Sequence, residues 1–302
     1  MYTVHVNPKS DFYLNIALTY NILSPSVNKP FFEELSISVI IPAYNSGKTI
    51  VKSLDSIVNQ TIAIYEVLII DDGSTDDTAE MVFNYIDKHP SHNIKLLQQP
   101  NYGPSSARNL GIEHAKGNLI AFLDSDDQWL PDKTMEQIEL FKTHGRALCL
   151  VGCLTSHSKK HNANQDLISV DFKDLLWRNY FSTPTVIIWK ELLLENSFNI
   201  NQKYSEDYNL WLRVARHGKV ILLNKVLVML DNKPVYGHAG LSSQMWKMEC
   251  GELSNYLMLF NDGIIKRYQY YFFSSFSLMK FFMRCIISFK RRWFSFNNKP
   301  SA

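Results

Sequence analysis

Three carboxylates stand within four positions where an apolar run ends. The stretch LIAFLDSDDQWLPDK covers residues 119–133, and Asp124, Asp126 and Asp127 directly follow its apolar part. Carboxylates this close repel one another, so a bound cation would stabilise them. Two acids spaced one apart can offer oxygens to a hard divalent ion, which also prefers water and substrate phosphates as ligands. The alternative is structural, with Asp127 or Asp132 serving as turn and helix-cap residues. The D-x-D spacing alone leaves both interpretations open.

Two further apolar runs end in residues suited to a nucleotide. Tyr44 follows SVIIPA and offers a flat ring on which a base could stack. Asp72 follows EVLIID and could accept a hydrogen bond from a nucleobase N–H. Arg108, after Gly103-Pro104, could pair with a base carbonyl or a phosphate. Their structural alternatives are a core aromatic, a turn residue and a solvated surface arginine.

Bringing these groups together requires strands that end at one edge of a sheet. Hydrophobic periodicity predicts strands over 36–44, 65–70, 93–99 and 118–124, and helices over 50–58, 75–88, 104–116 and 131–144. Strands that alternate with helices imply βαβ units and a largely parallel sheet covered on both faces. Because ligands bind beyond the carboxyl ends of such strands, we expect the three strand ends to form one site.

The second half of the chain has a looser pattern. A strand over 147–154 precedes a polar loop over 155–165. Regular structure is expected over 182–190, then a helix over 205–218 and a strand over 219–230. From residue 241 to about 293 the pattern predicts helix, with a break near Asp262-Gly263.

Composition narrows the class of protein. The 302 residues are 46% hydrophobic and 20% charged with a net charge of +2, so nothing global indicates a nucleic-acid partner. The four cysteines show no CxxC pair, which favours a reduced chain with buried thiols. We find no secretory signal pattern and no uncharged apolar run of about 18 residues. We therefore expect a cytoplasmic protein.

The last forty or so positions combine positive charge with an apolar stripe. No acidic residue follows Asp262, whereas basic residues recur to Lys299. Apolar residues repeat every three or four positions, namely Phe272, Phe276, Met279, Met283, Ile286, Phe289 and Trp293. Lys280, Arg284 and Arg291 follow the same rhythm on another face. This pattern predicts an interfacial membrane helix within 264–296. The alternative is a helix that packs on the domain or on a partner chain, as in a homo-oligomer.

Three segments together closely resemble the family 2 glycosyltransferases, which have the GT-A fold. They are SVIIPAYNSGKTIVKSLDSIVNQT, EVLIIDDGSTDDT and NYGPSSARNLGIEHAKGNLIAFLDSDDQWLPDK. The resemblance implies an α/β fold whose Rossmann-like, mostly parallel central sheet is flanked by helices, here with a helical amphipathic C-terminal extension. On this basis we divide the chain into an N-terminal extension (1–35), a catalytic domain (36–240) and a helical C-terminal region (241–302). The catalytic domain would have a nucleotide-sugar-binding half (36–145) and an acceptor half (146–240).

The resemblance also implies roles for particular residues. The base of a nucleotide-sugar would be held by Pro42, Ala43, Tyr44 and Asp72, and Arg108 would lie near the same nucleotide. In the motif Asp124-Ser125-Asp126, the first acid would contact the ribose. Asp126 would bind the Mg²⁺ or Mn²⁺ that bridges the diphosphate. His238 falls where related enzymes often carry a histidine near the metal, although a lone loop histidine is also a common surface residue.

A base for the acceptor hydroxyl is expected in the segment SEDYNLWLR. Glu206 and Asp207 stand at a helix start, where acids are also favoured by the helix dipole alone. The resemblance assigns Asp207 as the catalytic base and leaves Glu206 to orient the acceptor or the base. Trp211 and Arg213 are expected to pack and to anchor the helix.

The resemblance thus implies an inverting glycosyltransferase. It would move a sugar from a nucleotide-diphosphate donor to a hydroxyl of a saccharide or lipid-linked acceptor. A UDP-sugar is the favoured donor. The product would belong to a surface polysaccharide such as an O-antigen, capsule or lipopolysaccharide, made on the cytoplasmic face of the inner membrane. The Q-x-x-R-W motif of membrane-embedded synthases is absent, because Phe289 replaces its glutamine before Arg292-Trp293.

Two alternatives belong to other classes. A non-catalytic nucleotide-sugar-binding or scaffold subunit would not require the acids Asp124, Asp126 and Asp207, all of which are present. A nucleotidyltransferase would carry a G-x-G-x-R loop after the first strand, and this loop is missing.

Overall fold

The computed structural model describes residues 34–158, 160, 165–230 and 244–297. Most of the predicted N-terminal extension and His238 lie outside these residues. Residues Leu35–Ala302 form one compact unit. The division into nucleotide-sugar and acceptor halves stays a prediction.

Strands and helices alternate in the first half as predicted. They are β1 (Ile37–Ala43), α2 (Ile50–Val58), β2 (Glu66–Asp71), α3 (Thr78–Lys88), β3 (Ile94–Gln98), α4 (Pro104–His114) and β4 (Leu119–Phe122). The boundaries agree with the predicted ones to within a few residues.

The second half contains more elements than its sequence pattern indicates. They are β5 (Asp127–Trp129), α5 (Lys133–His144), η1 (Gly145–Ala147), β6 (Leu148–Thr155), β7 (Leu167–Val170), α6 (Phe172–Trp177), η2 (Thr183–Thr185), β8 (Ile187–Trp189), α7 (Lys190–Glu195), α8 (Glu206–Val214), β9 (Lys219–Leu230), α9 (Met245–Asn261) and α10 (Arg267–Asn297). The short elements β5, β7 and α6 were not predicted.

The strands form one nine-stranded sheet in the order β3-β2-β1-β4-β8-β6-β9-β5, with β7 paired to β9. The neighbours β3, β2, β1 and β4 are parallel, as are β6 and β9. In contrast, β8 is antiparallel to both β4 and β6, and β5 and β7 are antiparallel to β9. The central sheet flanked by helices is confirmed. Parallel pairing dominates the first half, whereas the second half is mostly antiparallel and its described strands contain one parallel pair, β6 with β9.

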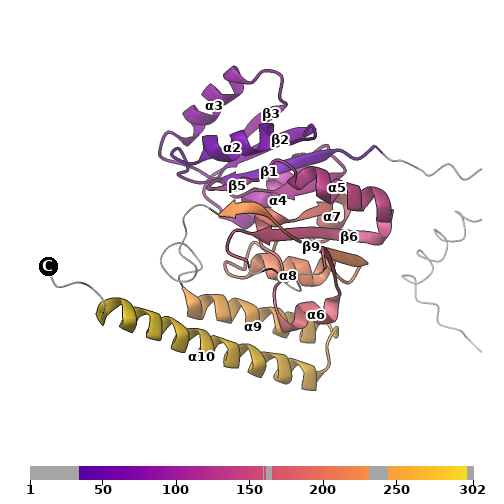
Figure 1. Ribbon diagram of the computed structural model, residues 1–302, viewed down its shortest axis with the longest axis vertical. Coiled ribbons are helices and arrows are strands. Elements are labelled where there is room, and N and C mark those ends of the chain that lie inside the picture. Colours follow the sequence, from indigo (N-terminus) through magenta and orange to yellow (C-terminus); the bar gives the residue numbers. More distant parts are fainter. Residues whose placement is uncertain (1–33, 159, 161–164, 231–243, 298–302) are drawn as a thin grey trace, which may run out of the picture. The chain divides into compact units, whose positions relative to one another are not determined.

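Helices cover both faces of this sheet (Figure 1), and each face has its own core. On one face, side chains of α2, α3 and α5 such as Leu54, Val82 and Phe141 are buried. On the other face, α4, α6, α7 and α8 pack with α9 outside them. Apart from Ser38, whose hydroxyl donates to Glu66, the strand β1 is apolar, and its alternate side chains enter the two cores, Val39 on one side and Ile40 on the other.

The helices α9 and α10 lie side by side beyond α8 (Figure 1). The turn between them has Gly263 in the left-handed region at φ +69°. The Gly263 N–H donates to Phe260 O and the Ile264 N–H donates to Leu259 O, which is the Schellman ending of a helix. The predicted break near Asp262-Gly263 is confirmed. None of the helices in the described ranges is long and apolar enough to cross a membrane.

Candidate active site

The strands β1, β2 and β4 are neighbours and end at the same edge of the sheet. The chain leaves β1 toward β2 and β3 on one side and returns on the other side as β4. The boundary between β1 and β4 is therefore the point where strand order reverses, which is where open α/β sheets bind ligands. The loops after β1 and β4 touch here, since Ser46 Oγ lies 2.7 Å from Ser125 Oγ.

Asp72 organises the loop that leads into α4. Its carboxylate accepts hydrogen bonds from Gln99 Nε2 at 2.6 Å, the Tyr102 N–H at 2.9 Å and the Gly103 N–H at 2.8 Å. Gly103 has φ +90°, a conformation that favours glycine, and Pro104 then starts the helix. A carboxylate has about four acceptor positions, so Asp72 retains capacity for one further donor.

The end of β1 lies beside Asp72. Ala43 is buried and its carbonyl accepts the Asp72 N–H at 2.8 Å, while Pro42 pairs with Ile70 of β2. Tyr44, the next residue, is 50% exposed. This exposure rules out the core interpretation of Tyr44 and leaves its ring available to a planar group.

Arg108 lies in the centre of the site rather than on the surface. Its side chain is 7% exposed, and its Nη2 pairs with Asp124 Oδ1 at 3.0 Å and its Nη1 with Glu206 Oε1 at 3.3 Å. The guanidinium also lies 5.3 Å from the ring centroid of Phe198. The alternative of a solvated surface arginine is therefore wrong. No sequence pattern relates Arg108 to these two acids, which are 16 and 98 positions away.

The charge of Arg108 is held by its partners. Burial lowers the pKa of Arg108, but the charges of Asp124 and Glu206 raise it by more, so the pKa lies above its ordinary value. The arginine thus connects an acid beyond β4 with the first residue of α8.

Asp207 follows Glu206 in the first turn of α8. Its carboxyl group is partly buried and accepts the Tyr208 N–H at 2.6 Å. Burial and then the charge of Glu206 raise the pKa of Asp207 to about 7. A carboxylate with this pKa can take up a proton near neutral pH, as a general base must.

The turn that presents these acids is held by α9. Ser205, just before α8, has φ +55°, which is uncommon for a residue other than glycine. The Ser205 carbonyl accepts hydrogen bonds from Gln202 Nε2 at 3.2 Å and from Asn255 Nδ2 at 3.1 Å, and its hydroxyl donates to Met248 O at 3.1 Å. We did not predict Gln202 or Asn255 from the sequence, because the segment containing Asn255 indicated only a helix.

A glycine allows α9 to approach this turn closely. A Cβ added at Gly251 would lie 2.3 Å from the Tyr204 carbonyl oxygen. Since the obstructing atom belongs to the backbone, any larger residue would push α9 away from the turn.

The acids after β4 fit a hard divalent cation. Asp124 and Asp126 are both partly exposed, and their oxygens are ligands that Mg²⁺ and Mn²⁺ prefer. No cluster of three or more histidine, cysteine or acidic side chains suited to a metal occurs in the part of the chain that the structure describes. A cation bound here would therefore take further ligands from water and a diphosphate. The predicted ligand His238 lies outside the described residues.

The other two acids of this segment have structural positions. Asp127 is buried at the start of β5, where it pairs with Leu230, and its N–H donates to Asp124 O at 3.0 Å. Asp132 stands at the start of α5, but its side chain makes no capping hydrogen bond. Asp132 therefore occupies the predicted N-cap position of α5, but its side chain does not form the hydrogen bond expected of a cap.

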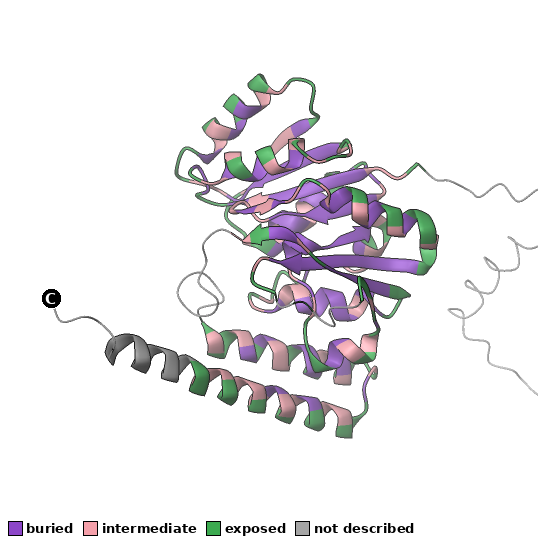
Figure 2. Cartoon of the chain, viewed as in Figure 1, coloured by how far each residue is buried: buried purple, intermediate pink, exposed green. Residues whose placement is uncertain are grey.

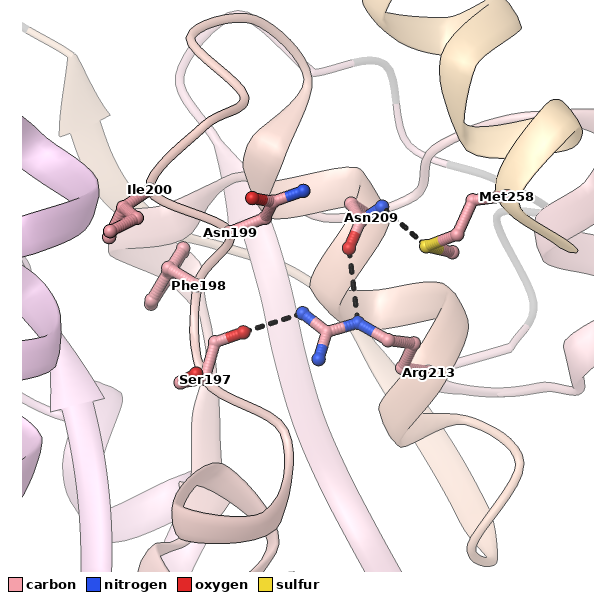
Figure 3. A pocket seen from close by; sticks show the side chains of 7 residues that line it. All are labelled: Ser197, Phe198, Asn199, Ile200, Asn209, Arg213 and Met258. Carbon is pink, nitrogen blue, oxygen red and sulfur yellow. Dashed lines mark hydrogen bonds between the residues drawn. The ribbon is translucent and has the colours of Figure 1, made fainter. Parts of the chain in front are cut away.

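A separate hollow of about 370 Å³ lies beside α8 (Figure 3). It is lined by Ser197, Phe198, Asn199, Ile200, Asn209, Arg213 and Met258. Arg213 donates from Nε to Asn209 Oδ1 at 3.0 Å and from Nη2 to Ser197 O at 2.6 Å, and Trp211 is fully buried. These contacts fit the expected anchoring and packing roles. None of the predicted site residues lines this hollow.

Several curated proteins of similar sequence are named as glycosyltransferases. The chain is 33% identical over 213 residues to an uncharacterized glycosyltransferase of Rickettsia felis, covering 68% of this chain and 34% of that protein. It therefore spans about a third of that relative's length. An uncharacterized glycosyltransferase of Haemophilus influenzae is 33% identical over 247 residues, covering 78% of this chain and 93% of its own. The UDP-Glc:alpha-D-GlcNAc-diphosphoundecaprenol beta-1,3-glucosyltransferase WfgD of Escherichia coli is 30% identical over 204 residues, with coverages of 64% and 74%.

Solved structures share the fold. The S. aureus TarS fragment 1–349 matches with a TM-score of 0.61 at 21% identity, over 81% of this chain and 71% of that chain. The mannosyltransferase PcManGT from Pyrobaculum calidifontis matches with a TM-score of 0.59 at 18% identity, over 83% and 71%. The GT-A fold expected from the sequence is thereby confirmed.

A family model also matches directly. The model of glycosyl transferase family 2 aligns with residues 38–199, a range that runs from within β1 past α7 and contains all of the predicted nucleotide-binding residues. This range is more than half of the chain, so the chain belongs to glycosyl transferase family 2.

Proposed function

We propose that the protein is an inverting glycosyltransferase that moves a sugar from a nucleotide-diphosphate donor to an acceptor hydroxyl. The observation that carries this proposal is the position of Asp207. It lies next to Glu206, which the buried Arg108 connects to Asp124 on the other side of the site. Through Arg108 and Glu206, Asp124 on the proposed donor side is thus linked to the segment that carries the candidate base Asp207.

The chemistry follows from the acidity of the acceptor. A sugar hydroxyl is a poor nucleophile unless its proton is removed as it attacks. Asp207, when ionised, takes this proton while the acceptor oxygen bonds to the anomeric carbon. The bond from that carbon to the diphosphate oxygen breaks, and the electron pair leaves with the nucleoside diphosphate. Attack from the face opposite the leaving group inverts the anomeric configuration. Glu206 orients the acceptor or the base.

The donor would lie across the ends of β1, β2 and β4. Asp72 has capacity for one base N–H, Tyr44 offers its exposed ring to the base, and Pro42 and Ala43 shape the strand end beneath it. Asp124 and Ser125 would face the ribose. TarS has been solved with UDP-GlcNAc, and PcManGT with GDP-Man. A UDP-sugar is our first choice of donor.

A divalent cation would be held by Asp126, with His238 as a further ligand. Mg²⁺ or Mn²⁺ at this position supplies positive charge that stabilises the departing diphosphate. The donor set of carboxylate oxygens supports this choice, and the PcManGT structure contains Mn²⁺.

The acceptor is proposed to be a saccharide or a lipid-linked glycan of a surface polysaccharide. The Escherichia coli relative named above acts on a diphosphoundecaprenol-linked sugar. A reaction on such a lipid would take place at a membrane surface, on the cytoplasmic face. The competing proposal, a non-catalytic nucleotide-sugar-binding subunit, predicts donor binding without turnover in any variant.

One experiment separates donor binding from transfer. UDP binding is measured by calorimetry with and without Mn²⁺. Transfer is measured with UDP-, GDP- and dTDP-sugars and an acceptor extract, as release of the corresponding nucleoside diphosphate. Asp207→Asn should bind UDP within about twofold of the unmodified protein and lose at least about a hundredfold in turnover. Asp126→Ala should lose the Mn²⁺-dependent part of UDP binding. The control Asp132→Asn, at the start of α5, should change neither quantity.

Two results would contradict the proposal. Retained turnover in Asp207→Asn would place the base elsewhere. Unchanged Mn²⁺-dependent UDP binding in Asp126→Ala would remove Asp126 from the metal site.

A further inference from the structure

Two basic residues of the helix α10 pair with acids of the neighbouring helix. Lys280 Nζ donates to Glu252 Oε1 at 2.9 Å and to Trp177 O at 2.9 Å, and Arg284 Nη2 pairs with Glu249 Oε2 at 2.7 Å. Both acids belong to α9. The sequence pattern predicted a cationic face on this helix, and the structure shows that Lys280 and Arg284 are committed to contacts within the protein.

The outer side of α10 is apolar and exposed. Figure 2 shows exposed and partly exposed positions along the outer side of this helix. Phe272 is 52% exposed, Phe282 is 61% exposed and Met283 is 58% exposed. Met279, Ile286 and Ile287 are exposed to a similar degree. Single exposed apolar residues are ordinary, but a continuous stripe along one helix marks an interaction surface.

We infer that the outer face of α10 lies in the surface of an anionic lipid bilayer. No acidic residue follows Asp262 in the sequence, whereas Lys290, Arg291 and Arg292 follow the apolar stripe. Anionic lipid headgroups provide the countercharge for such a cluster. The exposed Tyr268 and Tyr271, in the first two turns of α10, have the amphipathic rings that are enriched where membrane meets water.

A second copy of the chain fits this face less well. Two-stranded helical seams place opposite charges at the positions that flank the apolar stripe. Here the flanking positions include Phe276 and Leu278, and no acidic residue follows Asp262 to pair with the basic end. Two parallel copies would bring the like-charged ends together. A wide apolar face with only basic residues nearby is the pattern of a helix lying in the plane of a bilayer.

The internal ion pairs determine how binding should depend on salt. Because Lys280 and Arg284 are occupied by α9, the apolar side chains supply most of the binding and the basic end supplies the rest. High salt screens only the second contribution. Binding should therefore weaken but persist at about 0.5 M salt, unlike that of a purely electrostatic surface.

Vesicle sedimentation tests this inference without donor or acceptor, so its outcome is independent of the transfer reaction. The probe is vesicles of phosphatidylcholine with about a third phosphatidylglycerol. The variant Phe282→Ser/Ile286→Ser should reduce the partition coefficient by at least about tenfold, because it removes two large apolar side chains from the face that enters the bilayer. The matched control Phe83→Ser/Leu194→Ser replaces two exposed apolar residues on α3 and α7 and should bind like the unmodified protein.

Light scattering and thermal unfolding complete the test. Both double variants should unfold within a few degrees of the unmodified protein, because all four side chains are exposed. Vesicle binding that is absent in the unmodified protein, or equal in both variants, would overturn the inference. A dimer that the Phe282→Ser/Ile286→Ser variant converts to a monomer, without a change in vesicle binding, would assign the face to a second copy.

Discussion

Arg108 is surrounded by acids that belong to two different steps of the proposed reaction. It pairs with Asp124 beyond β4 and with Glu206 in α8. Its charge also lowers the pKa of Asp207, against the larger effects of burial and Glu206 that raise it. The protonation of the candidate base thus depends in part on a residue that is paired with two other acids.

This dependence predicts a particular pH profile. The pKa of Asp207 is raised to about 7, so the base is protonated below that pH and kcat/KM should fall as the pH drops through it. Arg108→Gln removes a nearby positive charge, which disfavours the ionised carboxylate, and should move this fall upward by about one pH unit. Arg108→Lys keeps the charge and should move it less, while its single ammonium group cannot reproduce both contacts.

The profile is measured as kcat/KM between pH 5 and 9 under saturating Mn²⁺. Asp132→Asn serves again as the control for loss of an acid outside the site. A fall at the same pH in Arg108→Gln and in the unmodified protein would show that Arg108 does not set the protonation of the base.

At the scale of elements, α9 fixes the geometry of the first turn of α8. Asn255 Nδ2 donates to the Ser205 carbonyl, and Asn255 Oδ1 accepts from Gln202 Nε2 at 2.8 Å and from Asn209 Nδ2 at 3.1 Å. Asn255 is completely buried. Because Ser205 has a left-handed backbone, the direction of Glu206 and Asp207 depends on these contacts holding that conformation.

Asn255→Ala should therefore impair transfer more than donor binding. A displacement of about 1 Å at a catalytic group can cost about a hundredfold in rate. We expect kcat to fall at least tenfold, while UDP binding changes less than about twofold because Tyr44 and Asp72 lie on other elements. The neighbouring substitution Ser254→Ala, at an exposed position of the same helix, should leave kcat unchanged. Equal losses in kcat and in UDP affinity would indicate general unfolding instead of misplacement of the base.

Elements with a strong local sequence pattern were predicted correctly, and those without one were not. The helices and strands of the first half have strong local signals, such as the continuous apolar run of β1 and Pro104 at the start of α4. In contrast, β5 is three residues long and contains a buried aspartate, and it exists because it pairs with β9 about a hundred residues later. Short strands of this kind depend on tertiary pairing and leave almost no local pattern.

The residues of the candidate site likewise fall into those that the sequence could predict and those that it could not. Its acids could be found from the sequence because they stand at the ends of apolar runs or at a helix start. Arg108 could be named as a candidate, but its partners could not, because contacts across 98 positions depend on the folded sheet. Asn255 and Gln202 had no signal, since an amide within a helical or polar segment is ordinarily a surface residue.

At the scale of the whole molecule, α10 contributes both to the fold and to the proposed membrane surface, and deleting the helix would remove both contributions at once. Its inner side buries Phe273, whose ring lies 6.1 Å from that of the fully buried Tyr256, and Ile265 just before the helix is also buried. Each such side chain contributes about 1.5–3 kcal/mol to folding. These contributions are large beside a total stability of about 5–15 kcal/mol. Loss of vesicle binding after removal of the entire helix could therefore result from loss of the fold.

Two truncations distinguish these contributions. Deleting residues 264–302 should lower the free energy of unfolding by about 3–6 kcal/mol, which urea denaturation would detect as a lower midpoint. Deleting residues 288–302 retains the contacts of Lys280, Arg284 and Phe273 and should leave the midpoint nearly unchanged. It also removes Lys290, Arg291 and Arg292, so vesicle binding should weaken and lose its salt dependence. An unchanged urea midpoint after the longer deletion would mean that α10 contributes nothing to the stability of the domain. A persistent salt dependence after the shorter deletion would mean that other basic residues face the lipid.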